Sequence, residues 1–188
     1  MKASRNSNLE TEIKLAAPDL EEARRRLRTA GFRVSKPRIF EENTLYDTPG
    51  LKLRKAQSLL RVRHVGESDK MTYKGRPRPS KHKSREELEV GIADAQTMAA
   101  ILNRLGLRPV FRYQKYRTEL RQKSGGGTAT LDETPIGGYM ELEGPAEWID
   151  RTAKKMGCSE KDYITVSYGT LYLDWCKKNH RTPGDMVF

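Results

Sequence analysis

The sequence predicts an α+β fold in which eight antiparallel strands close into a barrel and helices pack on its outside. Eight short stretches alternate between apolar and polar residues, which is the period of a strand. In seven of them the polar face carries acidic or basic side chains. One such face would be an ordinary solvated surface. Seven together favour a closed sheet that points its charges inward and its apolar faces outward, under the helices.

The first half of the chain predicts five strands, one helix and one loop. Residues 8–15 alternate without interruption, and the helix that follows opens near Pro18 and ends at Gly31. Residues 76–84 are basic, rich in proline and without any period, so we expect a mobile loop there. The other four strands of this half are expected over residues 39–47, 58–65, 70–75 and 84–92.

The second half begins with a helix that Asp94 caps and Gly106 closes. After the last strand, apolar residues recur at helical spacing, and we assign Tyr168 to the core packing of the final helix. Residues 181–188 predict a frayed, flexible tail. The three strands of this half are expected over residues 110–120, 128–133 and 139–144.

The composition is that of a basic protein with a single core. The 188 residues suit one domain, which we place at 1–188 with its core at about 8–175. The 36 Lys and Arg exceed the 25 Asp and Glu by 11 charges, which implies an anionic partner. No apolar run approaches the roughly 20 residues of a membrane helix. The first residues lack the apolar segment of a secretion signal, so we expect no membrane and a cytoplasmic location. Two cysteines are too few for a disulfide framework or a zinc site.

The inward charges themselves predict a ligand. Carboxylates that face one another need a cation, and a site made only of oxygen ligands selects a hard one, Mg²⁺ or Mn²⁺. Lys and Arg side chains that face one another need a polyanion, and the guanidinium group matches phosphate oxygens. A polyphosphate with bound metal satisfies both sets of charges together.

A series of short motifs runs along the chain in a fixed order. The first is Glu10-Thr11-Glu12-Ile13-Lys14, which has the form E-x-E-x-K. The later ones are N-T-L-Y-D-T-P (43–49), L-L-R-V-R (59–63), T-Y-K-G (72–75), R-E-E-L-E-V (85–90), K-Y-R (115–117), L-D-E (131–133), G-Y-M-E-L-E (138–143) and S-Y (167–168). Through these motifs the sequence resembles the CYTH superfamily, the triphosphate tunnel metalloenzymes, over about residues 8–175.

The resemblance implies an eight-stranded antiparallel tunnel with helices outside, in which acidic residues hold Mg²⁺ or Mn²⁺ and basic residues hold a triphosphate. The implied metal ligands are Glu10, Glu12, Asp132, Glu141 and Glu143, with Asp132 as a ligand or as a group that orients water. The implied substrate-binding residues are Lys14, Arg61, Arg63, Lys74, Arg85, Lys115 and Arg117. The implied catalytic residues are Glu10, Glu12, Lys14, Asp132 and Glu143.

Within the superfamily the sequence is most similar to class IV adenylyl cyclases, which implies conversion of ATP to cyclic AMP and pyrophosphate. The alternative is a triphosphatase that hydrolyses inorganic triphosphate, thiamine triphosphate or a nucleoside triphosphate. A third interpretation is a non-catalytic basic module that binds phosphate or nucleic acid. That module would explain the charge excess, but its paired acidic residues would repel a phosphate backbone. We therefore expect a small-molecule triphosphate as the partner, disfavour nucleic acid, and leave a homodimer open.

Overall fold

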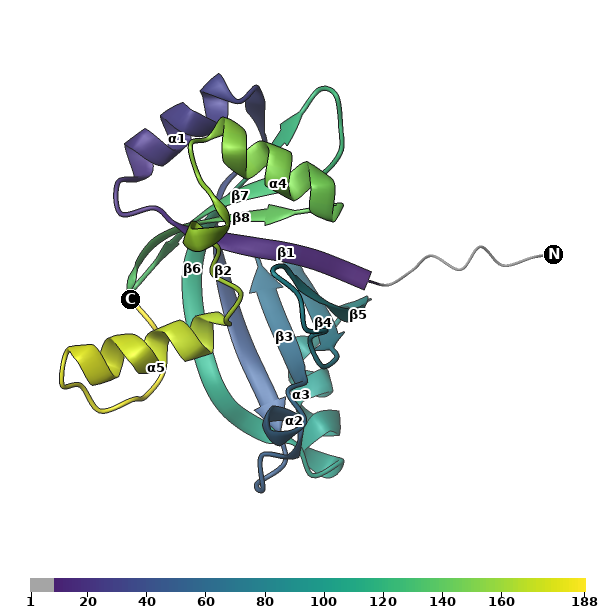
Figure 1. Cartoon of the computed structure of the whole chain (residues 1–188). Coiled ribbons are helices and arrows are strands. Elements are labelled where there is room, and N and C mark those ends of the chain that lie inside the picture. The colour runs from purple at the N-terminus through teal and green to yellow at the C-terminus, as the bar shows by residue number, and fades with distance from the viewer. Residues whose placement is uncertain (1–8) are drawn as a thin grey trace.

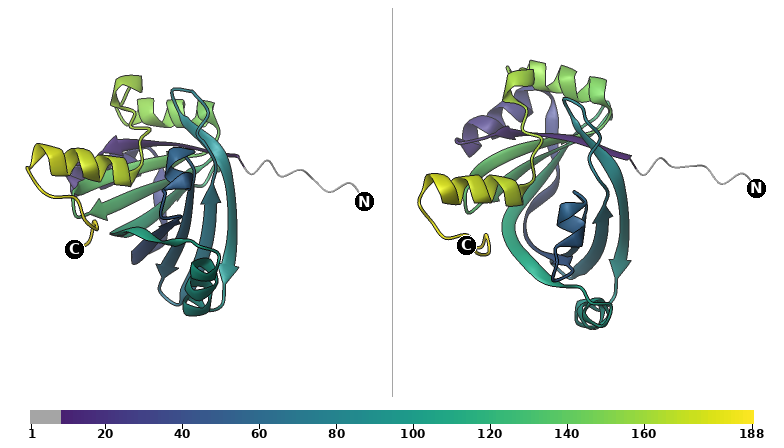
Figure 2. Two further views of the ribbon diagram at one scale, coloured as in Figure 1. Left: turned by 90° about the horizontal axis from the view of Figure 1, so that it is seen from below. Right: turned by 60° about the horizontal axis from the view of Figure 1, so that its bottom comes forward.

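Eight antiparallel strands form a closed barrel, in the order β1-β5-β4-β3-β2-β6-β7-β8 around the ring (Figure 1). The structure is a computed structural model that describes residues 9–188. The strands are β1 (Leu9–Ala16), β2 (Phe32–Asp47), β3 (Leu59–Val65), β4 (Ser68–Lys74), β5 (Lys83–Ile92), β6 (Arg108–Gln122), β7 (Thr128–Thr134) and β8 (Gly137–Glu143). The predicted barrel is confirmed, and the view along it shows the ring of strands (Figure 2).

Five α-helices and one 3₁₀ turn connect the strands or follow them within the described residues. They are α1 (Leu20–Thr29), α2 (Lys52–Lys55), α3 (Ala95–Arg104), α4 (Ala146–Lys155), η1 (Glu160–Asp162) and α5 (Tyr168–Lys178). The first helix begins two residues after Pro18 because the Asp19 carboxylate accepts the backbone N–H groups of Glu21 and Glu22, which otherwise lack partners. None of the helices in the described part of the chain is both long and apolar enough to cross a membrane.

The hydrophobic core lies outside the barrel, between the sheet and its helices. α1 and α4 lie side by side over β1, β7 and β8 (Figure 1). Ile13 and Leu142 point outward into this layer and are fully buried, as are Leu27 of α1 and Ile149 of α4. A smaller apolar cluster joins α3 to β2 and β3. Because the apolar side chains are buried outside the ring, the interior is left to the other face of each strand.

β2 is longer than predicted and begins at Phe32 rather than at residue 39. Its first half has no alternation because almost all of it is exposed. Backbone pairing with β6 still holds this half in the sheet, through register shifts on both sides of Lys36. A strand that is exposed on both faces carries no periodic signal in its sequence, which is why the prediction missed it.

The C-terminal tail, predicted to be frayed, is fixed to β6. β7 covers β6 only from Tyr116 onward, which leaves the edge of the earlier residues open. Met186 fills part of that edge: its N–H donates to the Arg112 carbonyl, its carbonyl accepts from Gln114, and its side chain is 1% exposed. The prediction of a flexible tail is therefore wrong for this segment.

Candidate active site

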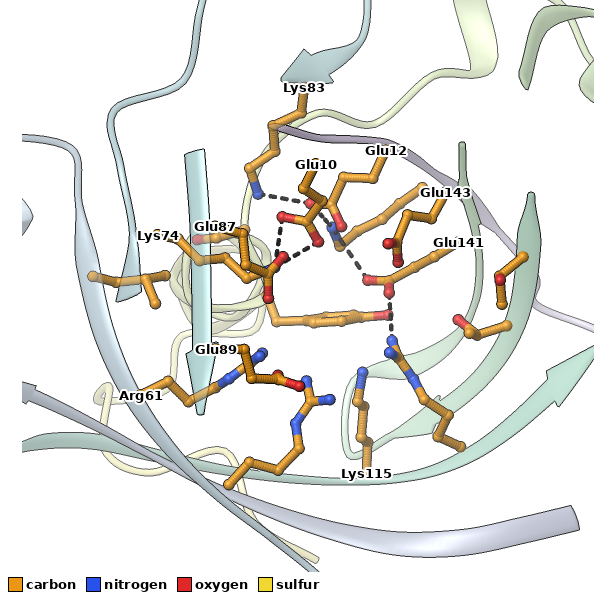
Figure 3. Close-up of a pocket in the computed structure, with 18 of the residues that line it drawn as sticks. Glu10, Glu12, Arg61, Lys74, Lys83, Glu87, Glu89, Lys115, Glu141 and Glu143 are labelled. Carbon is orange, nitrogen blue, oxygen red and sulfur yellow. Dashed lines mark hydrogen bonds and ion pairs between the residues drawn. The ribbon is translucent and has the colours of Figure 1, made fainter. Parts of the chain in front are cut away.

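A cavity of about 460 Å³ lies inside the barrel and is lined almost entirely by ionisable side chains (Figure 3). Every site residue predicted from the sequence lines it, apart from Asp132. The predicted residues that it brings together are Glu10, Glu12, Lys14, Arg61, Arg63, Lys74, Arg85, Lys115, Arg117, Glu141 and Glu143. We refer to this cavity as the tunnel.

Strand register sets which charges face each other. Lys14 of β1 lies directly opposite Glu141 of β8, so an acid and a base share one rung of the ladder. Glu12 lies opposite Glu143, which instead puts two carboxylates side by side. Opposite charges across a rung stabilise the sheet and like charges destabilise it. The Glu12–Glu143 rung therefore places two like charges directly opposite each other in the tunnel.

One side of the tunnel holds Glu10, Glu12, Glu141 and Glu143 with ammonium groups between them, whereas Glu89 lies near Arg61 (Figure 3). The Lys74 Nζ lies 2.6 Å from both carboxylate oxygens of Glu10. Glu12 has Lys14 and Lys83 each at 3.1 Å. Burial, and then the nearby Glu12 charge, raises the pKa of Glu10 to about 7. Burial likewise raises the pKa of Glu143, which lies at the rim with no ion pair to the described residues.

These carboxylates fit a hard divalent cation in their chemistry, but they do not form a ready-made cage. No group of three potential ligands among residues 9–188 is assembled closely enough to hold a metal ion. Lys14, Lys74 and Lys83 lie between the acids and separate them. The carboxylates oppose one another, and burial and repulsion from Glu12 raise the pKa of Glu143, so a cation would relieve a real repulsion. The donors that fit it are Glu10, Glu12, Glu141 and Glu143.

Asp132 lies on the inward face of β7, beneath the side chains that line the tunnel, and is fully buried. Its carboxylate accepts hydrogen bonds from Lys115 (2.7 Å), from Arg117 (2.7 and 2.6 Å) and from the Tyr168 hydroxyl (2.7 Å). Burial raises the pKa of Asp132, but Arg117 and Lys115 outweigh it and the net pKa is lowered. Because its oxygens are occupied in this way, the geometry favours a role in positioning the two bases over a role as a metal ligand.

Two of the basic residues in the tunnel, Arg61 and Arg85, have buried donors without acceptors among the described residues. Arg61 is 7% exposed, and its guanidinium donates only to the Tyr113 hydroxyl at 3.4 Å and to Thr72 at 3.2 Å. Its Nε, like that of Arg85, has no hydrogen-bond acceptor among the described residues. An unmade hydrogen bond of a buried group is costly, more so when the group is charged. An anion bound beside Arg61 would supply the hydrogen-bond acceptor that its Nε lacks among the described residues.

Several residues in or next to the tunnel were not among the predicted site residues. Glu41 lies inside the strand predicted over residues 39–47, and Lys83 continues the alternation of Arg85 just before the strand predicted over residues 84–92. Following the alternation would therefore have found both. Tyr113 also points inward, but aromatic residues do not signal a charged face. Tyr168 was assigned to the helix core, yet its ring lies 5.3 Å from the Lys14 Nζ and 5.1 Å from the Lys115 Nζ. No periodic signal distinguishes that role from packing.

Comparison with known proteins identifies a family that matches most of this chain and a relative of similar sequence. The family described as the CYTH domain matches residues 8–168. A protein of Methanocaldococcus jannaschii named "putative adenylate cyclase" is 30% identical over 135 residues, which cover 72% of this chain and 76% of that protein.

Two solved structures share the fold. One is a "putative adenylate cyclase" from Vibrio parahaemolyticus, with a TM-score of 0.74, 19% identity and coverage of 87% of this chain and 97% of that one. The other is a "putative adenylyl cyclase" from Hippeastrum described as having a dominant triphosphatase activity. It has a TM-score of 0.63, 18% identity and coverage of 93% of this chain and 97% of that one.

Proposed function

Because the chain belongs to the CYTH domain family, we propose that it is a divalent-metal-dependent enzyme that acts on a triphosphate bound in the tunnel. The activity we propose is that of a class IV adenylyl cyclase, which converts ATP to cyclic AMP and pyrophosphate. The name of the Methanocaldococcus jannaschii relative supports this choice. The alternative is hydrolysis of inorganic triphosphate, thiamine triphosphate or a nucleoside triphosphate, which the description of the Hippeastrum protein supports.

The observation that carries the proposal is the buried Arg61 guanidinium, which has donors but no carboxylate partner among the described residues. Arg63 lies beside it, and burial together with the Arg61 charge lowers the pKa of Arg63. Glu41 lies 3.6 Å from Arg63 but forms no ion pair with Arg61, so a further anion beside Arg61 would still be favourable. Phosphate oxygens match the paired N–H groups of this side chain in geometry and in charge.

In the proposed complex each side of the tunnel has its own task. Arg61, Arg63 and Arg117 would hold the phosphate oxygens in line, and Asp132 would keep Lys115 and Arg117 aimed at them. Glu10, Glu12, Glu141 and Glu143 would hold Mg²⁺ or Mn²⁺, which supplies charge neutralisation to the reacting phosphate. Phosphoryl transfer depends mainly on such positioning and neutralisation, so a tunnel of fixed charges is suited to it.

The two candidate reactions differ in the nucleophile and in the phosphorus atom that it attacks. In the cyclase the ribose 3′-hydroxyl loses its proton and attacks the α-phosphorus, and pyrophosphate leaves. In the triphosphatase water loses a proton and attacks the terminal phosphorus, the bond to the diphosphate portion breaks, and that diphosphate leaves while the attacked group becomes orthophosphate. A non-catalytic phosphate-binding or nucleic-acid-binding module is the remaining candidate, and the tunnel glutamates argue against it because they would repel a phosphate backbone.

Product analysis separates these candidates. The purified protein would be incubated with ATP, tripolyphosphate or thiamine triphosphate, each with Mg²⁺, with Mn²⁺ or with neither, and the products resolved by ion-exchange chromatography. Cyclic AMP with pyrophosphate supports the cyclase, and orthophosphate supports the triphosphatase. Absence of any metal-dependent product from all three substrates would contradict the proposed function.

A further inference from the structure

A second cavity, of about 570 Å³, lies between the β4–β5 loop, Gln57 and Thr165. Lys83 lines both this cavity and the tunnel, so the two adjoin at that side chain. Figure 3 shows Lys83 reaching from its strand toward the acidic residues of the tunnel. The volume is within the range of small-molecule sites. We refer to this second cavity as the vestibule.

The loop that forms the vestibule is held in place, although the sequence predicted a mobile loop over residues 76–84. The Arg78 N–H donates to the Ser84 carbonyl at 2.8 Å, so the loop closes as a short ladder. His82 is buried and hydrogen-bonded to Asp150 of α4 at 2.8 Å, and Lys81 forms an ion pair with the same carboxylate at 3.0 Å. The vestibule is therefore largely preformed.

The lining of the vestibule differs in chemistry from that of the tunnel. None of the described residues that line it carries a carboxylate, whereas the tunnel contains several. Pro77 and Pro79 present flat apolar surface, and Arg76 and Arg78 supply guanidinium groups. Arg76 donates to the Gln57 side-chain oxygen at 3.1 Å, which limits its freedom to rotate. Such a site does not suit a metal ion, and it suits a flat, electron-rich ring with hydrogen-bonding edges.

We propose that the vestibule binds the base and ribose of a nucleoside triphosphate whose phosphates lie in the tunnel. This inference rests on the proposed function, and it deepens that function by naming an organic triphosphate rather than inorganic triphosphate as the preferred substrate class. The guanidinium group of Arg78 stacks on the base, and Gln57 and Thr165 offer hydrogen bonds to its edge or to the ribose. Lys83, at the junction, lies near the point where the phosphate chain leaves the tunnel.

The test compares ATP with tripolyphosphate, which lacks the nucleoside that the vestibule would hold and carries one more negative charge when fully ionised. Dissociation constants for ATP and for tripolyphosphate would be measured by isothermal titration calorimetry without added divalent metal. The proteins are the wild type, Arg78→Ala, Thr165→Val, and Lys155→Ala as an exposed, remote control on α4. We expect wild type to bind ATP more tightly than tripolyphosphate. We expect Arg78→Ala to weaken ATP binding by about two- to fivefold, the range of one exposed cation–π contact, and to leave tripolyphosphate binding unchanged.

The outcomes separate this inference from the proposed function. Equal losses for both ligands, or no loss for ATP in either vestibule variant, would overturn the vestibule assignment. So would tighter wild-type binding of tripolyphosphate or of a long-chain polyphosphate, because the vestibule would then hold further phosphates. If ATP binding depends on Arg78 but product analysis finds no turnover, the vestibule assignment stands and the enzymatic proposal fails.

Discussion

At the scale of single residues, the tunnel is defined by charges that the chain itself leaves uncompensated. Arg61 has a buried Nε without an acceptor. Glu143 faces Glu12 across the ladder and forms no ion pair among the described residues. Arg61 would therefore be stabilised by a bound anion, and Glu143 by a bound cation. Each can be tested by itself.

Removing the Arg61 guanidinium separates specific binding from general basicity. If Arg61 holds a phosphoryl oxygen, Arg61→Ala should lower kcat/KM on the best triphosphate by about 30- to 1000-fold, which corresponds to roughly 2–4 kcal/mol of transition-state stabilisation. Lys155→Ala removes the same charge from an exposed site on α4 and should stay close to wild type. Equal losses in the two variants that shrink together as salt is raised would show a diffuse field instead.

The ionisation of Tyr113 can be followed by absorbance, and it reports on an anion bound near Arg61. Burial raises the pKa of this phenol, but Arg61, Arg63 and Lys115 outweigh it and lower the pKa to about 8. One of the eight tyrosines should therefore ionise near pH 8 in an absorbance titration at 295 nm, and Tyr113→Phe should remove that step. Tripolyphosphate should move the step to higher pH, because a bound anion offsets the three positive charges. If the pH of this ionisation step does not change when tripolyphosphate is added, the anion binds away from Tyr113.

The lowered pKa of Tyr113 also determines the direction in which its contribution to the free energy of unfolding changes with pH. Its folded pKa of about 8 is below the ordinary tyrosine value of about 10, so between these pH values the unfolded chain binds more protons than the folded protein. The Tyr113 contribution to the free energy of unfolding should thus increase from pH 8 to pH 10. Denaturant unfolding of wild type and of Tyr113→Phe across this range isolates that contribution.

At the scale of elements, the C-terminal tail acts as an additional edge of the sheet. Met186 is buried against Tyr113 and Tyr168, which line the tunnel. Met186→Ala should lower the free energy of unfolding by about 2–4 kcal/mol, as expected for a large-to-small substitution in a core. Phe188→Ala is the matched control, because Phe188 is 62% exposed and should lose far less. Similar small losses in denaturant unfolding would mean that the tail contributes little.

The sequence predicts the elements that alternate and fails where alternation is absent. Ile13 and Lys14 belong to a strand with one apolar and one charged face, and such strands were located to within one or two residues. The start of β2 is exposed on both faces, and Met186 has a single backbone-paired position, so neither gives a periodic signal. The inward side chains followed from the same alternation. The inward position of Tyr168 could not be predicted from alternation, because it depends on how α5 packs across the barrel.

At the scale of the whole molecule, stability and ligand binding are linked through the charged interior. A ligand that binds only the folded state adds RT ln(1 + [L]/Kd) to its stability, or about 2.7 kcal/mol at one hundred times Kd. Tripolyphosphate and Mg²⁺ together should raise Tm by more than the sum of their separate effects, because each neutralises charges that the other leaves. Differential scanning calorimetry with each, with both and with sulfate as an unrelated anion checks this. Purely additive shifts would argue against a shared site.

The closure of the barrel also has a consequence for how the protein is made. β1 pairs with β5 on one side and with β8 on the other, so the ring cannot close until β8 has been synthesised. Until then, a nascent chain carries one unpaired edge of β1, and the outward Ile13 and Leu15 lack the part of their apolar layer that β8 and α4 supply. Contacts so distant in sequence form slowly, and open strand edges invite association. The growing chain should therefore depend most on chaperones just before β8 emerges from the ribosome.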